Sequence, residues 1–290
     1  MTQPIERDRI YRGRRFQTET IELCVRWYIT YRLSYRDLAA MMAERGVVVS
    51  HTTIMRWVLH YLPEYEERWN RFARPVDTSW RMDETAIRVR GKSAYLYRAV
   101  DNHGKSVDSL LRNDRGIDAA QAFFRKAVAT KQSTWPRKRT LDGHAASHRA
   151  VCLLGDEDQR WKSVLVRSCR YLNNIVEQDH RAIKRRCASM LGFKSFETAA
   201  TALAGIELAH RIHKGQFYFD GKGPQGGSSL KHFWNLALAT SQSRNSRRSV
   251  FPPVRSAMHQ NSNARMHKNS TANKTSPLRY ARKVFYRGGL

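Results

Sequence analysis

Hydrophobic positions in the first part of the chain recur at the spacing of helices. Residues 18–32 place their apolar side chains on one stripe, which predicts an amphipathic helix. A second helix is expected over 35–45, because Gly46 is a residue type that commonly follows a helix end. Ser50 is a good N-cap for a third helix over 51–62. Two helices joined by a glycine turn in this way predict a helix-turn-helix.

From residue 80 the pattern changes to short strand-like runs separated by tight turns. Three such runs within residues 80–113 predict an antiparallel meander. Helices and strands then alternate, with helices over 116–131, 145–155 and 173–190 and strands over 135–142 and 161–169. The order β-β-β-α-β-α-β-α predicts an α/β fold of the ribonuclease H-like type, similar to a retroviral integrase core, with a mixed five-stranded sheet.

The last part of the chain is basic and of low complexity. A helix is expected over 196–214, and no acid follows Asp220, whereas residues 221–290 hold 13 lysines and arginines. Ser, Asn and Gln are frequent there, which predicts a disordered tail with one short helix over 230–239.

The overall charge narrows the class of partner. The formal net charge is +27, and 38 of the 52 basic residues are arginines, whose planar guanidinium suits phosphate. Nucleic acid is therefore the first expected partner and a membrane surface the weaker one. We find no apolar run of transmembrane length and no leader pattern. The four cysteines form no CxxC pair, which favours a reduced, cytoplasmic protein without a zinc ribbon.

The expected third helix opens with side chains that suit DNA contact. A helix-turn-helix presents the start of its second helix to base edges and phosphates. The candidates are His51, Thr52, Thr53 and Arg56, with Arg14 and Arg15 from the basic arm over 9–16. The alternative is a plain helical hairpin that packs on the next domain.

Three acids far apart in the sequence are the candidates for chemistry. In the predicted fold, Asp83 lies on the first strand, Asp142 ends the fourth, and Glu177 lies in the first turns of the last core helix. Carboxylates from these three places can hold two Mg²⁺ ions, which prefer hard oxygen ligands and support phosphoryl displacement. Glu84 competes with Asp83. Strand alternation sends the two to opposite faces, so only one is expected to point at the site, and the spacing does not show which.

The helix over 173–190 separates packing residues from candidate functional ones. Asp179 points about 200° away from Glu177 and is expected to pair with an arginine or to face solvent. The expected packing stripe consists of Val176, His180 and Ile183.

The stripe beside it carries the candidate functional residues. Glu177 and Lys184 lie two turns apart, with Arg181 between them, so the acid is placed to bind metal and the cations to contact DNA. The alternative is an ordinary solvated helix on which Glu177 and Arg181 form an i,i+4 ion pair.

Several motifs resemble the DDE transposases of the insertion-sequence-six family. The similarity covers about residues 12–216 and includes WRMDETAIRVRG, TLDGH and NNIVEQDHRAIKRR. Asp142 and Glu177 have 34 residues between them, which is the family's spacing, and Lys184 falls at the family's basic position. The resemblance also favours Asp83 over Glu84 as the first acid.

This resemblance implies an enzyme that moves DNA. It would bind the terminal inverted repeats of its element, free a 3′-OH at each end and join it to target DNA. The implied cofactor is Mg²⁺, with Mn²⁺ as a substitute and no nucleotide. The implied partners are double-stranded DNA and at least a second copy of the chain, in the cytoplasm at the bacterial nucleoid. The alternative is an inactive DNA-binding remnant or regulator.

The resemblance also predicts how the chain is divided. Family members usually end soon after the K-G-Q stretch, so the 74 residues beyond Gln216 are a departure. The expected segments are a basic arm with the helix-turn-helix over 1–62, a linker over 63–79, a catalytic domain over 80–216 and a basic tail over 217–290.

Overall fold

The N-terminal part of the chain folds into three helices. The computed structural model describes residues 8–130, 135–169, 174–188, 190, 192–219 and 230–239. Ser50 caps the third helix and Gly46 takes a positive φ of 73°, as the sequence predicts. Ser34 caps the second helix in a capping box with Asp37. The elements are the 3₁₀ helix η1 (Arg9–Tyr11) and the helices α1 (Thr18–Thr30), α2 (Tyr35–Ala43) and α3 (His51–Asn70).

Helix α3 is longer than the sequence predicts. It passes through Pro63, which cannot donate a hydrogen bond inside a helix, and ends at Asn70 instead of Leu62. Tyr65 and Trp69 continue the apolar stripe beyond the proline and are fully buried. Their burial explains why the helix continues where a local signal predicts its end. The expected linker is therefore helical over its first residues.

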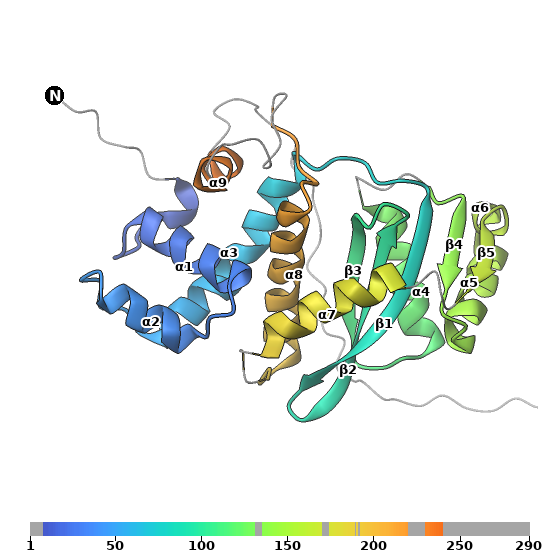
Figure 1. The fold of residues 1–290 in the computed structure, drawn as a ribbon, viewed down its shortest axis with the longest axis horizontal. Helices are drawn as coiled ribbons and strands as arrows, with labels where there is room; N and C mark the ends of the chain where they lie inside the picture. The colour runs from blue at the N-terminus through green and yellow to red at the C-terminus, as the bar shows by residue number, and fades with distance from the viewer. Residues whose placement is uncertain are drawn as a thin grey trace, which may run out of the picture. The chain divides into compact units, whose positions relative to one another are not determined.

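The central feature is a mixed five-stranded sheet (Figure 1). The strand order is β3-β2-β1-β4-β5, in which β1–β2 and β2–β3 are antiparallel and β1–β4 and β4–β5 are parallel. This confirms the predicted ribonuclease H-like arrangement. The strands are β1 (Ser79–Val89), β2 (Lys92–Asp101), β3 (Ser106–Arg112), β4 (Lys138–Leu141) and β5 (Leu165–Ser168). The helices are α4 (Ile117–Ala129), α5 (Ala145–Glu157), α6 (Gln159–Lys162), α7 (Asn174–Ala188) and α8 (Phe196–His213).

Strand β5 is shorter than expected. The run over 161–169 begins with the end of α6, because Trp161 turns inward and is buried there. Only Leu165–Ser168 pair with β4, at one edge of the sheet.

The two faces of the sheet pack into separate hydrophobic clusters. On β1, Trp80 and Met82 join a cluster with α4 and α5, whereas Ile87 and Val89 join a cluster with α8 and the N-terminal helices. The alternation of β1 therefore places Asp83 on the α8 side and Glu84 on the α4 side.

The N-terminal helices share their core with α8. Gly205 of α8 is so close to α1 and α3 that an added Cβ would lie 2.5 Å from Cδ1 of Leu62 and 2.8 Å from Cγ2 of Ile29. Only a residue without a side chain fits at this contact. The described residues all belong to one compact unit, and the predicted boundary after residue 62 stays a prediction.

Part of the predicted tail over 217–290 is folded. Phe217 and Phe219 are buried, and the short helix α9 (Leu230–Leu238) forms as predicted. The rings of Phe219 and Trp234 lie 5.4 Å and 5.2 Å from Trp69, so both segments pack on α3. The remaining predicted tail residues lie outside the described part of the chain.

Candidate active site

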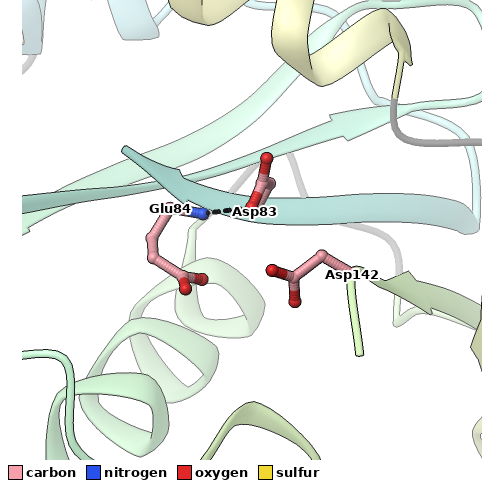
Figure 2. Close-up of side chains that lie close together, drawn as sticks. All are labelled: Asp83, Glu84 and Asp142. Atoms are coloured by element: carbon pink, nitrogen blue, oxygen red, sulfur yellow. Dashed lines mark hydrogen bonds between the residues drawn. The ribbon is translucent and has the colours of Figure 1, made fainter. Parts of the chain in front are cut away.

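Two neighbouring strands bring Asp83 and Asp142 together. Asp83 lies in β1 and Asp142 directly follows β4, and the parallel register pairs Arg81 with Thr140, two residues before each acid. Carboxylate oxygens of Asp83, Asp142 and Glu84 all lie within 4.8 Å of one another (Figure 2). The strand pairing itself therefore builds the acidic cluster.

The carboxylate of Glu84 lies closer to those of Asp83 and Asp142 than strand alternation predicts. Figure 2 shows Asp83 and Glu84 on opposite sides of β1, but the longer Glu84 side chain still brings its carboxylate near Asp142. The expectation that only one of the two points at the site is therefore not met. The partners of the two differ, since Glu84 is ion-paired with Nε of Arg115 and only 3% of its side chain is exposed.

Backbone N–H groups hold one oxygen of each aspartate. The amide of Glu84 donates to Oδ1 of Asp83 at 2.8 Å, and the amide of His144 donates to Oδ1 of Asp142 at 3.0 Å. The second oxygens make only long contacts, to Nδ1 of His180 and to the guanidinium of Arg115, both at 3.7 Å. One oxygen of each acid is thus oriented and the other is left for a ligand.

The cluster resists full ionisation. Burial, followed by the charges of Asp142 and Glu84, raises the pKa of Asp83 to about 7, and the charge of Glu177 adds to this. A bound cation would remove the repulsion. The three carboxylates of this cluster also supply the hard oxygen ligands that Mg²⁺ prefers, so the residues fit a divalent metal.

The raised pKa of Asp83 predicts an unusual pH dependence for the stability of the metal-free protein. The raised pKa means that the folded state holds the proton more tightly than the unfolded chain, so the stability from this group is full below about pH 4 and lost as the pH rises through about 7. Thermal unfolding in EDTA at pH 5 and pH 8 should show this loss, and Asp83→Asn should remove it. Added Mg²⁺ should stabilise the wild type more at pH 8 than at pH 5, because the ion needs the ionised carboxylate. Equal stabilisation at both values would contradict Asp83 as a ligand.

Glu177 lies near the cluster but outside it. It is in the first turn of α7, half of its side chain is exposed, and it lies 3.8 Å from the guanidinium of Arg181. Its charge reaches Asp83, yet Glu177 does not belong to the group of acids whose oxygens all lie within 4.8 Å of one another. Lys184 is exposed, as expected for a cation placed to meet a phosphate.

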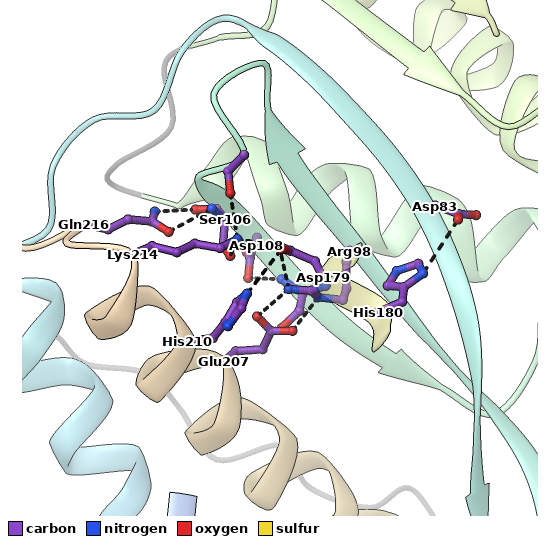
Figure 3. A network of polar contacts seen from close by, with 12 residues as sticks. Asp83, Arg98, Ser106, Asp108, Asp179, His180, Glu207, His210, Lys214 and Gln216 are labelled. Carbon is purple, nitrogen blue, oxygen red and sulfur yellow. Dashed lines mark hydrogen bonds and ion pairs between the residues drawn. The ribbon is translucent and has the colours of Figure 1, made fainter. Parts of the chain in front are cut away.

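A buried polar network fixes the rotation of α7 (Figure 3). Asp179 points to the opposite side from Glu177 and pairs with Arg98 of β2 at 3.2 Å and with Lys214. Glu207 and His210 of α8 complete the network. Burial opposes the ionisation of Asp179, but the hydrogen bond of His210 and the charges of Arg98 and Lys214 outweigh it and hold the pKa well below its usual range.

The network confirms one expectation, since Asp179 does pair with an arginine. His210 is largely buried beside Asp179. The predicted packing stripe of Val176, His180 and Ile183 is buried as expected.

Three residues around the acids were not expected from the sequence. Arg115 contacts both Glu84 and Asp142, His144 pins Asp142 through its amide, and His180 faces Asp83 from α7. Burial and the charge of Arg98 lower the pKa of His180 to about 3, so its ring is neutral. Only His144 had a local signal, since a residue two positions after an aspartate often donates its amide to it.

The candidate DNA-contacting residues of the N-terminal part are at the surface. At the start of α3, His51, Thr52 and Arg56 are exposed, whereas the hydroxyl of Thr53 lies 2.8 Å from the capping Ser50. Arg14 and Arg15 are exposed as well, and Arg14 lies 3.2 Å from Nε2 of His60. Their role in DNA binding, and the helix-turn-helix itself, stay predictions.

Known proteins are similar in sequence to the region that holds the acids and to most of the chain. A family model described as a DDE domain matches residues 77–216. The transposase for insertion sequence-like element IS431mec of Staphylococcus aureus (strain Mu50) is 36% identical over 204 residues, which cover 70% of this chain and 88% of that one. The chain belongs to the insertion-sequence-six family of DDE transposases. This transposase is also 36% identical, over the same shares, to the transposase of IS257 in transposon Tn4003 of Staphylococcus aureus.

Among solved structures, the transposase is similar to two retroviral proteins. One is the BIV integrase catalytic core, with 17% identity over 51% of this chain and 90% of that one and a TM-score of 0.36. The other is the HTLV-2 integrase catalytic core in complex with magnesium, with 11% identity over 46% and 84% and the same TM-score. The fold assignment rests on the strand order and pairing and not on these similarities.

Family membership makes the protein a polynucleotidyl transferase that depends on a divalent metal. Within the described residues, none of the transposase's helices combines the length and apolar character needed to cross a membrane.

Proposed function

We propose that this transposase cuts DNA at the ends of its insertion sequence and joins the freed 3′-OH groups to target DNA. The observation that carries the proposal is the cluster of Asp83 and Asp142 oxygens, just beyond the point where the pairing of β1 with β4 ends. We assign Asp83, Asp142 and Glu177 as the ligands of two Mg²⁺ ions, with Mn²⁺ as a substitute. When bound, such ions activate the attacking oxygen and stabilise the leaving one.

The residues around the acids have separate tasks in this proposal. The amides of Glu84 and His144 orient Asp83 and Asp142, so that their second oxygens face the reacting phosphate. Glu177 must turn from Arg181 toward Asp83 to complete the ligand set. Arg181 and Lys184 then lie on the same exposed face of α7 and contact the DNA backbone.

We further propose how the DNA is held. The start of α3, with His51, Thr52, Thr53 and Arg56, binds the terminal inverted repeat, and Arg14 and Arg15 contact phosphates. Two element ends must be joined in one reaction, so the active form contains at least two copies of the chain. No nucleotide is needed, because the attacking 3′-OH replaces one phosphodiester with another.

The test uses the DNA on either side of the reading frame. The full chain, Mg²⁺ and a labelled duplex carrying that terminal sequence should give a cut at the element end and a product joined to a second duplex. Binding without either product, in both Mg²⁺ and Mn²⁺, would favour the alternative, a DNA-binding remnant or regulator of a decayed element.

A further inference from the structure

The hairpin between β1 and β2 ends in a basic pocket that the proposed reaction does not use. The pocket has a volume of about 620 Å³ and opens between the hairpin tip and the segment that leads from α7 to α8. It is lined by Arg88, Arg90, Gly91, Gly192, Phe193 and Lys194.

Backbone contacts make this pocket a preformed surface. Arg90 has a φ of 50° and Gly91 a φ of 75°, which close the hairpin in a tight two-residue turn. The amide of Arg90 donates to the carbonyl of Phe193 at 2.8 Å, and its Nε donates to the carbonyl of Lys194 at 2.5 Å. Val89 and Phe193 also form a parallel bridge. The hairpin and the segment before α8 are therefore held together before any ligand arrives.

The cations of the pocket lack ion-pair partners in the described part of the chain. Arg88, Arg90 and Lys194 are exposed, and no described carboxylate lies within ion-pair distance of them. The charge of Arg90 contributes to the lowered pKa of Glu197, but the two residues form no ion pair. Fixed guanidinium and ammonium groups around an open pocket suit the phosphates of a nucleic-acid backbone.

The pocket lies at a defined distance from the acids. Arg88 lies five positions after Asp83 in β1, which corresponds to roughly 17 Å along a strand. Helix α7 covers a similar length, since Glu177 and Ala188 are roughly 16 Å apart at the rise of a helix. Because DNA advances 3.4 Å per nucleotide of one strand, this distance equals roughly five nucleotides.

The pocket also lies on the side of the N-terminal helices. The hydroxyl of Tyr28 in α1 donates to the sulfur of Met190 at 3.3 Å, and Nε of Arg186 donates to the carbonyl of Ile29 at 3.3 Å. The segment between α7 and α8 thus connects the sheet with α1. An element end that lay across the acids and was bound by the N-terminal helices, as proposed above, would pass this segment.

We infer that Arg88, Arg90 and Lys194 form a docking site for the phosphate backbone of the element's own end, roughly five nucleotides inside the cut. The inference rests on the proposed function, because it takes the element end to lie across Asp83 and Asp142. Arg90 also shapes the hairpin, so Arg88 and Lys194 are the residues to alter.

The test compares Arg88→Gln/Lys194→Gln with the wild type on two duplexes. One carries 40 base pairs of the terminal sequence beside the reading frame. The other keeps only the first three base pairs of the element inside the cut, so it lacks the position of the proposed contact. On the long duplex the variant should bind roughly 10- to 30-fold more weakly near 150 mM salt, and the slope of log affinity against log salt should fall by roughly 0.9 for each lost phosphate contact. On the short duplex it should bind like the wild type.

A matched control removes the same number of positive charges from another part of the surface. Arg149→Gln/Lys162→Gln removes one exposed arginine and one exposed lysine from α5 and α6, and it should bind both duplexes like the wild type. Thermal melting confirms that each variant is folded. Wild-type affinity of the variant on the long duplex, or an equal loss on both duplexes, would overturn the inference. A wild type that binds but never cuts would overturn the proposed function instead, and the binding comparison would still decide the docking site.

Discussion

Asp142→Asn should lower the rate of strand transfer by about 10³-fold or more, equivalent to about 4 kcal/mol of transition-state stabilisation. The substitution keeps the size of the side chain and an oxygen that can still accept the amide of His144. It removes the negative charge that Asp142 places beside Asp83 in the acidic cluster. The measurement is the single-turnover rate on terminal DNA in Mg²⁺. A product yield equal to that of the wild type would show that the three-acid assignment is wrong.

Glu84 provides the sharpest control for this result. Asp83→Asn should be as damaging as Asp142→Asn, whereas Glu84→Gln should cost less than tenfold, because Glu84 is already paired with Arg115. Circular dichroism and thermal melting separate loss of folding from loss of activity. If Glu84→Gln is the more damaging of the two neighbours, Glu84 and not Asp83 is the ligand from β1.

Arg98→Ala should lower the free energy of unfolding by about 3–5 kcal/mol, as is typical when a buried charge loses its partner. Arg98 is 1% exposed and bridges Asp179 and Glu207, so its removal leaves two buried carboxylates with fewer partners. Urea denaturation at pH 7 measures the loss.

The matched control for Arg98 is Arg88→Ala in the neighbouring strand. Arg88 is exposed and donates only to the carbonyl of Gly91, so the change should stay within about 0.5 kcal/mol. A loss below about 1 kcal/mol for Arg98→Ala would mean that Lys214 and His210 are enough to satisfy Asp179. The wild type should also lose stability as the pH falls below about 4, because the unfolded chain then binds a proton at Asp179 that the folded protein, with its lowered pKa, does not bind.

The parts of the fold that were predictable from the sequence depend on local signals. Ser34, Ser50 and Gly46 mark helix ends through their own backbone and side-chain preferences, and the alternating runs mark the strands. The end of α3 was not predictable in this way, because the burial of Tyr65 and Trp69 against distant segments outweighs the local effect of a proline.

The candidate site shows the same division. The predicted fold order made Asp83, Asp142 and Glu177 the candidates, the family resemblance favoured Asp83 over Glu84, and strand order explains why the first two meet. The network around Asp179 could not be inferred, since Arg98 is 81 residues from Asp179 and 109 from Glu207. The distance between Glu177 and the other acids could not be inferred either, because it depends on how α7 packs and not on the position of Glu177 in the sequence.

The contact at Gly205 limits how this protein can be recombined with its relatives. Because Leu62 and Ile29 rest directly on the backbone of α8, the first 70 residues are not an exchangeable cassette. A chimera that takes its N-terminal helices from another transposase would inherit side chains shaped for a different partner surface. Such a hybrid should fold only when the residues that meet at Ile29, Leu62 and Gly205 come from the same parent, so exchanges between relatives would have to be confined to exposed positions of these helices.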